Sequence, residues 1–310
     1  MILGAQKLPD EEYFAMHAVS NSKLADLAKC PREYWYSWRM VWEETPAMRL
    51  GKMFHCFLLE PDEFPRRYFL FDENERPEQD KTMASNANKR WKQSIVATEA
   101  MAGRQPYDAS EMITLKSMRS AVWDEVAAWA LIETPGEFEQ AFTWEQDVDW
   151  YSFSKKKVQK SLVQMKLKSD KLIRDMNCIL DIKTTNDASP KWWNSHAWEY
   201  GYHRQAALYS DALGITDFYI LAVETKAPYN VALYKADPSL LDKGRNYVAA
   251  TADPGWGYKP LLEKLCQLRE RHGMEFPAPG EKNAKPWPMY AYWAKPGKNG
   301  ILEWKAPLWT

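Results

Sequence analysis

The sequence lacks the features that mark several protein classes. Its four cysteines are widely spaced and none belongs to a CxxC pair, so neither a disulfide scaffold nor a structural zinc site is expected: Cys30, Cys56, Cys178 and Cys266. No apolar run approaches the ~20 residues of a membrane span. The N-terminal residues lack the charged-then-apolar layout of a signal peptide. We therefore expect a cytoplasmic protein with no membrane partner.

A surplus of positive charge is also absent. The 310 residues hold 41 Lys plus Arg against 42 Asp plus Glu, so composition alone does not favour a polyanionic partner. The distribution is uneven, because residues 155–174 carry eight basic residues and a single acid, Asp170. Lys155, Lys156 and Lys157 fit a solvated turn between strands. Their position just before a predicted acidic strand favours instead a surface that binds phosphates.

The middle of the chain places two carboxylates and a lysine on neighbouring strands. From residue 163 to 168, apolar and polar residues alternate strictly, which predicts a strand with one buried face and puts Asp170 on its polar face. The next apolar run leads into Asp181 and Lys183, which share a face because they are two residues apart. A tight hairpin over 171–177 would bring both carboxylates beside the lysine. This arrangement suits a Mg²⁺ site that cleaves a phosphodiester, although Asp is also common in turns at strand ends, and Lys183 could be an exposed strand lysine.

The secondary-structure pattern predicts helices first and strands later. Helices are expected at 21–29, 32–40, 47–59, 87–99, 108–131, 189–213, 238–250 and 257–272. Strands are expected at 137–144, 148–153, 161–169, 177–183, 217–224 and 229–235. This order favours an α/β (α+β) fold with a mostly antiparallel sheet over alternating βαβ units. We expect a helical part at 1–135, a sheet core at 136–272, and a tail at 273–310 that is rich in Pro, Trp and Lys.

The motifs resemble the PD-(D/E)xK nuclease superfamily and, within it, the RecE-like (exodeoxyribonuclease VIII-like) phage recombination exonucleases. Five ordered segments carry the resemblance, which covers residues 18–272. They are VSNSKLADLAKCPREYWYSW (19–38), RLGKMFHCFLLEPDEF (49–64) with the Gly-x-x-x-His motif of RecB-type nucleases, SDK with DIK (169–171 and 181–183), EYGYHRQAALYSDAL (199–213) with a Gln-x-x-x-Tyr motif, and ILAVETKAPYNVALYKAD (220–237). Ser169 stands where the motif often has proline.

The resemblance implies a restriction-endonuclease-like fold, a central mixed sheet flanked by helices. It also implies a metal-dependent exonuclease that acts on double-stranded DNA ends, degrades one strand 5′ to 3′, and leaves a 3′ single strand for a partner annealing protein. Ring-shaped homo-oligomers and a phage or prophage origin in a bacterial host are typical of the family. In such an enzyme, a water molecule activated by metal would attack the phosphorus in line.

The same resemblance assigns roles to individual residues. The metal ligands would be His55, Asp170 and Asp181, and the other catalytic residues would be Lys183, Glu139 and Gln205. His55 could instead be a buried core histidine, and Glu139 has Glu137 and Glu145 as close alternatives. The DNA-binding set would be Lys155, Lys156, Lys157, Lys166, Lys168 and Tyr209, although Tyr209 could equally pack in the core. Mg²⁺ is the expected cofactor, and Mn²⁺ is expected to substitute because an imidazole ligand suits it.

Two other functions remain open at this level. An endonuclease or nickase would use the same fold and site, and a non-catalytic DNA-binding or assembly protein would use the fold alone. The complete set of Asp170, Asp181 and Lys183 argues against the second. Trp192, Trp193 and Trp198 cluster on one predicted helix, where aromatic rings stack on unpaired bases or, more commonly, fill a core.

Overall fold

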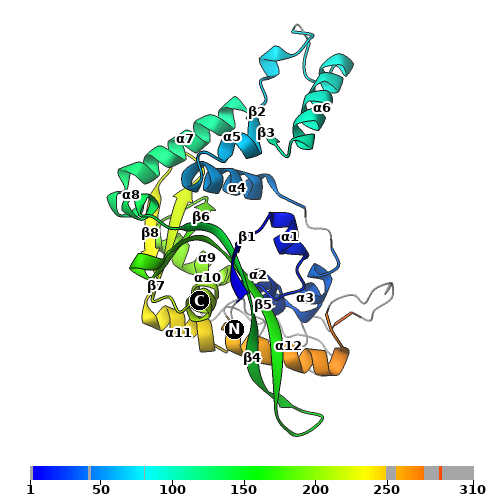
Figure 1. Ribbon diagram of the computed structural model, residues 1–310, viewed down its shortest axis with the longest axis vertical. Coiled ribbons are helices and arrows are strands. Elements are labelled where there is room, and N and C mark those ends of the chain that lie inside the picture. The colour runs from blue at the N-terminus through cyan, green and yellow to red at the C-terminus, as the bar shows by residue number, and fades with distance from the viewer. Residues whose placement is uncertain (1–2, 41–42, 80, 249–255, 276–285, 288–310) are drawn as a thin grey trace, which may run out of the picture.

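A central six-stranded mixed sheet with helices on both faces forms the body of the protein (Figure 1). The structure is a computed structural model and describes residues 3–40, 43–79, 81–248, 256–275 and 286–287. The strand order is β1-β4-β5-β6-β7-β8, and only β6 and β7 pair in parallel. Its strands are β1 (Leu3–Lys7), β4 (Glu137–Ser152), β5 (Lys157–Ile173), β6 (Cys178–Thr185), β7 (Asp217–Glu224) and β8 (Val231–Lys235). The predicted fold class is confirmed.

Two apolar clusters hold the helices against the sheet. One cluster packs against helices α2 (Asn21–Lys29), α3 (Pro31–Ser37), α9 (Pro190–Glu199), α10 (Tyr202–Leu213), α11 (Pro238–Asn246) and α12 (Tyr258–His272). The other packs against α4 (Pro46–Leu59), α5 (Phe64–Arg67), α7 (Ala109–Asp124) and α8 (Val126–Glu133). A small lobe projects from the body and contains α6 (Asn86–Met101) with the parallel pair β2 (Tyr68–Leu70) and β3 (Gln105–Tyr107). The short helix α1 (Asp10–Ala15) follows β1.

Two helices predicted as continuous are each broken in two. The predicted helix at 108–131 is interrupted at Glu125, whose backbone is extended (φ −91°, ψ 94°). The predicted helix at 189–213 is interrupted at Gly201, which has a left-handed backbone (φ 70°) that glycine tolerates best. A Cβ at Gly201 would lie 2.1 Å from the guanidinium of Arg204, so the break also makes room for that buried side chain.

The strands that carry the predicted site are longer than expected. The segments 137–144 and 148–153 form a single strand, β4, which pairs with β5 from Glu137↔Leu172 to Ser152↔Lys157. Strand β5 continues to Ile173, so the predicted hairpin at 171–177 shrinks to a tight turn after the strand. Asp170 therefore lies inside β5 and not at its end. The β4–β5 ribbon extends well beyond the sheet (Figure 1).

Most of the predicted tail, 273–310, lies outside the described residues, as does the end of the helix expected at 238–250. Two described residues of this region pack against the body. Glu275 accepts a hydrogen bond from the Tyr34 hydroxyl at 2.8 Å and pairs with Arg269, and the ring of Trp287 is fully buried 5.7 Å from that of Tyr34. In the described part of the chain, no helix combines the length and the apolar character needed to cross a membrane.

The close approach of α10 and α11 yields a stability prediction. A Cβ at Gly244 would lie 2.1 Å from the carbonyl oxygen of His203, whereas one at Gly51 would meet Thr184 Oγ1 at 3.2 Å. Both glycines are helical, so alanine improves helix propensity similarly at each. We expect Gly244→Ala to have a free energy of unfolding about 2 kcal/mol lower than Gly51→Ala, because backbone overpacking is costly. Urea unfolding of the two variants measures the difference, and equal midpoints and slopes would contradict it.

Candidate active site

An open cleft of about 1310 Å³ is lined by all of the predicted catalytic and metal-binding residues. It forms where β5 and β6 separate. The two strands pair only from Lys171↔Leu180 to Ile173↔Cys178. Beyond that point the Asp170 side chain bridges the two strands, because its Oδ2 accepts a hydrogen bond from the backbone N–H of Ile182 at 2.7 Å. One carboxylate therefore satisfies a strand donor and stands at the mouth of the gap.

Glu139 lies directly across from Asp170 on β4. The flanking pairs Phe138↔Lys171 and Gln140↔Ser169 fix this position. Glu139 has a left-handed backbone (φ 53°), a conformation that costs a residue with a side chain about 1–2 kcal/mol. Backbone strain of this kind is concentrated at functional sites.

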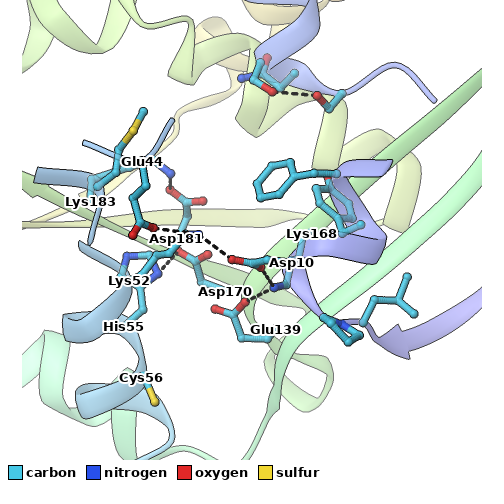
Figure 2. A pocket seen from close by; sticks show the side chains of 18 of the residues that line it. Asp10, Glu44, Lys52, His55, Cys56, Glu139, Lys168, Asp170, Asp181 and Lys183 are labelled. Atoms are coloured by element: carbon cyan, nitrogen blue, oxygen red, sulfur yellow. Dashed lines mark hydrogen bonds and ion pairs between the residues drawn. The ribbon is translucent and has the colours of Figure 1, made fainter. Parts of the chain in front are cut away.

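His55 completes a group of three potential ligands. Its Nδ1 lies 3.6 Å from Asp170 Oδ2, and one ligand atom from each of His55, Glu139 and Asp170 lies within 4.8 Å of the others (Figure 2). Helix α4 can bring His55 this close because Gly51, one turn earlier, lies against Thr184 of β6.

Asp181 lies beside this group but is held by protein contacts. Its Oδ1 accepts a hydrogen bond from Gln205 Nε2 at 2.7 Å, and its Oδ2 lies 2.6 Å from Lys183 Nζ. Burial raises the pKa of Asp181 to about 6; the Lys183 ammonium opposes this shift and the Asp170 charge adds to it. Asp181 is thus a third carboxylate of the site, oriented by α10 through Gln205.

Lys183 remains an ammonium group in this setting. Burial alone would lower the pKa of Lys183, but the carboxylates of Asp181 and Asp170 outweigh it and raise the pKa above its usual value. The ammonium also lies 5.2 Å from the centroid of the Tyr202 ring, a cation–π contact. The alternation of β6 had correctly placed Asp181 and Lys183 on one face.

A chain of ion pairs extends the site beyond the predicted residues. Lys168 Nζ lies 2.7 Å from Glu139 Oε2 and 2.8 Å from Asp10 Oδ1. Lys52 Nζ lies 2.9 Å from Asp10 Oδ2 and 3.0 Å from Glu44 Oε1. Lys52 precedes His55 by one turn on α4, which is a signal the sequence offered. Asp10 and Glu44 come from distant segments with no motif around them.

The charges of this cluster do not balance. Its members are five carboxylates, on Asp10, Glu44, Glu139, Asp170 and Asp181, and three ammonium groups, on Lys52, Lys168 and Lys183. The formal difference equals the charge of one divalent cation. A mixed set of imidazole and carboxylate ligands binds Mn²⁺ well, and the oxygens also suit Mg²⁺. The donor set and the charge therefore both fit a divalent metal ion.

The structure contradicts one predicted DNA contact and gives two others, which line the cleft, additional contacts within the protein. Lys166 is buried, and its ammonium donates to the carbonyl oxygens of Tyr13 and Met16 at 2.7 and 3.0 Å, so it faces no solvent. Burial lowers the pKa of Lys166 to about 8. The Lys168 ammonium forms ion pairs with Glu139 and Asp10 in the cleft. Tyr209 is buried with its ring edge toward Phe218, which favours the packing interpretation. Lys155, Lys156 and Lys157 are exposed at the tip of the β4–β5 ribbon.

The strain at Glu139 yields a prediction that separates function from folding. Glu139→Gly and Glu139→Ala both remove the carboxylate, so both should weaken Mn²⁺ binding to the same extent. Only glycine relieves the left-handed backbone, so Glu139→Gly should be about 1 kcal/mol more stable to urea than Glu139→Ala. Isothermal titration with Mn²⁺ and urea unfolding in EDTA check the two statements. Equal stability of the variants would show that the backbone at this position is not strained.

Comparisons with known proteins bear on the same part of the chain. Residues 154–254, which contain Asp170, Asp181, Lys183 and Gln205, match a family described as a PDDEXK-like domain of unknown function (DUF3799). No match was found among the curated proteins. Among solved structures, a "putative exonuclease" from Eubacterium rectale is similar with a TM-score of 0.46 and 14% identity, over 76% of this chain and 80% of that one. The protein SSO0001 is similar with a TM-score of 0.29 and 12% identity, over 73% of this chain and 71% of that one. The family match supports placing the segment with the acidic pair and Lys183 in the PD-(D/E)xK nuclease superfamily.

Proposed function

We propose that this protein is a metal-dependent exonuclease that acts on the ends of double-stranded DNA. One observation carries the proposal: His55, Glu139 and Asp170 offer ligand atoms within 4.8 Å of one another, beside a buried Asp181–Lys183 pair, in an open cleft. Carboxylates, an imidazole and an ammonium group in one place supply what phosphodiester hydrolysis requires, namely sites for a cation and a positive group near the phosphate.

The residues of the site have distinct tasks in this reaction. His55, Glu139 and Asp170 would hold the cation, with Asp181 as the adjacent carboxylate. A bound divalent cation would polarise a phosphate oxygen and lower the pKa of a water molecule. Lys183 keeps its proton because Asp181 lies 2.6 Å away, so its ammonium can offset the negative charge that develops on the phosphate oxygens.

Gln205 and Lys168 act as positioning residues. The Gln205 amide fixes the Asp181 carboxylate, which in turn fixes Lys183. Lys168 fixes Glu139 opposite Asp170. Both tie the site to neighbouring structure, α10 on one side and the segment that carries Asp10 on the other. A site supported in this way holds its geometry before substrate binds.

The contact with the DNA backbone would extend to the exposed Lys155, Lys156 and Lys157. These lysines lie at the tip of the β4–β5 ribbon, which extends beyond the sheet (Figure 1), and they do not line the cleft. Lysine–phosphate contacts provide affinity without sequence preference and weaken with salt, as an enzyme that degrades any sequence requires.

The finer properties of the proposed enzyme rest on the ordered motifs at residues 18–272. They support degradation from 5′ to 3′, a 3′ single strand delivered to an annealing protein, and a homo-oligomeric ring. They also support the cytoplasm of a bacterial host, with a phage or prophage origin, as its setting. An endonuclease or nickase of the same superfamily, or a DNA-binding protein without catalysis, would share most of these sequence features.

The first prediction of this proposal concerns end-labelled DNA. Linear duplex labelled at one 5′ end should lose its label early in the presence of Mg²⁺ or Mn²⁺, whereas a covalently closed circle should stay intact. EDTA should abolish the reaction, and Asp181→Ala should reduce the rate by at least about 100-fold, because it removes the carboxylate that positions Lys183, the group that stabilises transition-state charge. Gel analysis of both substrates over time measures this.

Each departure from that pattern would indicate a different activity for this protein. Cutting of the circle would move the assignment to an endonuclease or nickase. Early loss of a 3′ label would reverse the polarity. Binding of DNA without metal-dependent cleavage of either substrate would favour the non-catalytic alternative.

A second prediction concerns the choice of metal. Because His55 contributes nitrogen, Mn²⁺ should support cleavage at least as well as Mg²⁺. His55→Ala should weaken Mn²⁺ binding by at least about tenfold, and His17→Ala, outside the cleft, should not. Titration calorimetry with Mn²⁺ reports this without any activity assay. Strict dependence on Mg²⁺, or unchanged Mn²⁺ affinity in His55→Ala, would count against His55 as a ligand.

A further inference from the structure

A column of aromatic rings runs along α9 and ends at the candidate site. Trp192 and His196 are stacked with ring centroids 3.7 Å apart and planes at 11°. His196 and Tyr200 follow at 6.3 Å. Tyr200 and Tyr202 are stacked at 5.7 Å, and the Tyr202 ring contacts the Lys183 ammonium. The column therefore connects the outer surface of α9 with the catalytic strand β6.

Helix geometry explains the column, which is only partly covered by the core: Trp192 packs against the apolar cluster and Tyr200 does not belong to it. Trp192, His196 and Tyr200 are four residues apart and so share one stripe of α9. A different tryptophan anchors the helix, because Trp193 is buried and stacks on Tyr234 at 5.1 Å with planes at 2°. Tyr200 is 54% exposed and lines the cleft. The stripe thus presents aromatic surface to solvent next to the site.

The other tryptophan of this segment is also accounted for. Trp198 stacks on His203 at 4.0 Å and meets the edge of Tyr247. Of the three tryptophans on α9, Trp193 and Trp198 therefore contribute to packing, and Trp192 belongs to the stripe while one side of it packs against the apolar core. The packing interpretation accounts for Trp193 and Trp198 and for only part of the Trp192 ring.

The spacing within the column admits a base at one point. Stacked bases lie ~3.4 Å apart along a strand, so a base between two rings separates them by about 7 Å. His196 and Tyr200 are 6.3 Å apart, close to that value, with planes tilted by 42°, whereas Trp192 and His196 are already in contact. A base between His196 and Tyr200 therefore requires the exposed Tyr200 side chain to rotate until the two rings are parallel.

From these contacts we infer that the stripe of Trp192, His196 and Tyr200 binds unpaired nucleobases of a DNA strand at the mouth of the cleft. The inference rests on the proposed nuclease function and specifies its substrate: an end at which the two strands have separated. Aromatic rings stack on any base, so such a platform holds a strand without reading its sequence. Its position beside Lys183 would keep the frayed strand next to the phosphate that reacts.

Binding to bases can be separated from binding to the backbone. The probe is a fluorescently labelled oligothymidine, compared with an oligonucleotide of equal length in which the bases are absent but every phosphate remains. Ca²⁺ replaces Mg²⁺ and Mn²⁺, and a gel confirms that the probe stays intact. We expect the protein to bind oligothymidine about 5- to 150-fold more tightly than the abasic strand, by fluorescence anisotropy, which is the range for one stacked base.

Matched variants locate the effect. Tyr200→Ala and Trp192→Ala should each reduce this preference for bases, and Tyr200→Phe should retain it because stacking needs the ring and not the hydroxyl. Trp123→Ala removes an equally exposed aromatic ring (60%) on α7 and should change nothing. A thermal melt of each variant verifies that it is folded; Tyr200→Ala and Trp123→Ala change exposed side chains, and Trp192→Ala changes a half-buried one.

Several results would overturn the inference. Equal affinity of the wild-type protein for the two probes would do so, as would an unchanged preference in Tyr200→Ala and Trp192→Ala. The same holds if Tyr200→Phe loses the preference along with Tyr200→Ala. In each case the proposed nuclease stands if wild-type protein still degrades linear duplex in Mn²⁺, and falls separately if it does not.

Discussion

Repulsion between carboxylates at the point where β5 and β6 separate is the constraint that organises this protein. Glu139 and Asp170 face each other across two paired strands, and Asp181 lies nearby on the third. Like charges placed opposite one another destabilise a sheet. Lys168 at one side and Lys183 at the other compensate part of this charge. A fold that keeps the remaining negative charge in one cleft is suited to hold a cation there.

The strained residue of the site is held by the sheet on both sides. Gln140, the residue after Glu139, pairs with Lys7 of β1 and with Ser169 of β5. Strand β4 is therefore an interior strand at this point. The left-handed backbone at Glu139 cannot relax by a shift of the strand register, because β4 is paired on both sides. The long β4–β5 pairing adds to this restraint. Backbone strain persists only where the surrounding structure fixes it in this way. The pairing of β1 with β4 therefore helps to hold Glu139 in its strained conformation.

Much of the fold and part of the site could be predicted from the sequence. Alternation located β5 and β6, placed Asp181 and Lys183 on one face, and brought Asp170 to them. The alternation pattern gave wrong assignments where lysines are buried. Lys171 is fully buried because its ammonium donates to the carbonyl oxygens of Leu131 and Ile132 at the end of α8. Because its polarity assigned Lys171 to a turn, the predicted strand ended at residue 169, whereas β5 continues to Ile173. Lys166 misled the assignment of DNA contacts for the same reason.

The rest of the site could not be predicted because it depends on contacts between distant segments. Asp10 meets Lys168 across more than half the chain and also meets Lys52, and Glu44, which pairs with Lys52, lies before the predicted helix at 47–59. Neither carboxylate belongs to a motif. Helix breaks had weak local signals as well: Gly201 stood in the middle of a good helical pattern, and only its contact with Arg204 shows why the helix must stop there.

The balance of charge in the cleft connects cation binding with substrate binding. Without a cation, five carboxylates and three ammonium groups leave the cluster negative, and a DNA phosphate would be repelled. In the proposed nuclease, a divalent cation would remove that surplus and offer a ligand position to the phosphate. DNA would then be held at this cleft only together with the cation, while the lysines at the ribbon tip would act independently of it. Cation and DNA binding would thereby be linked, and by thermodynamic necessity each would strengthen the other by the same factor.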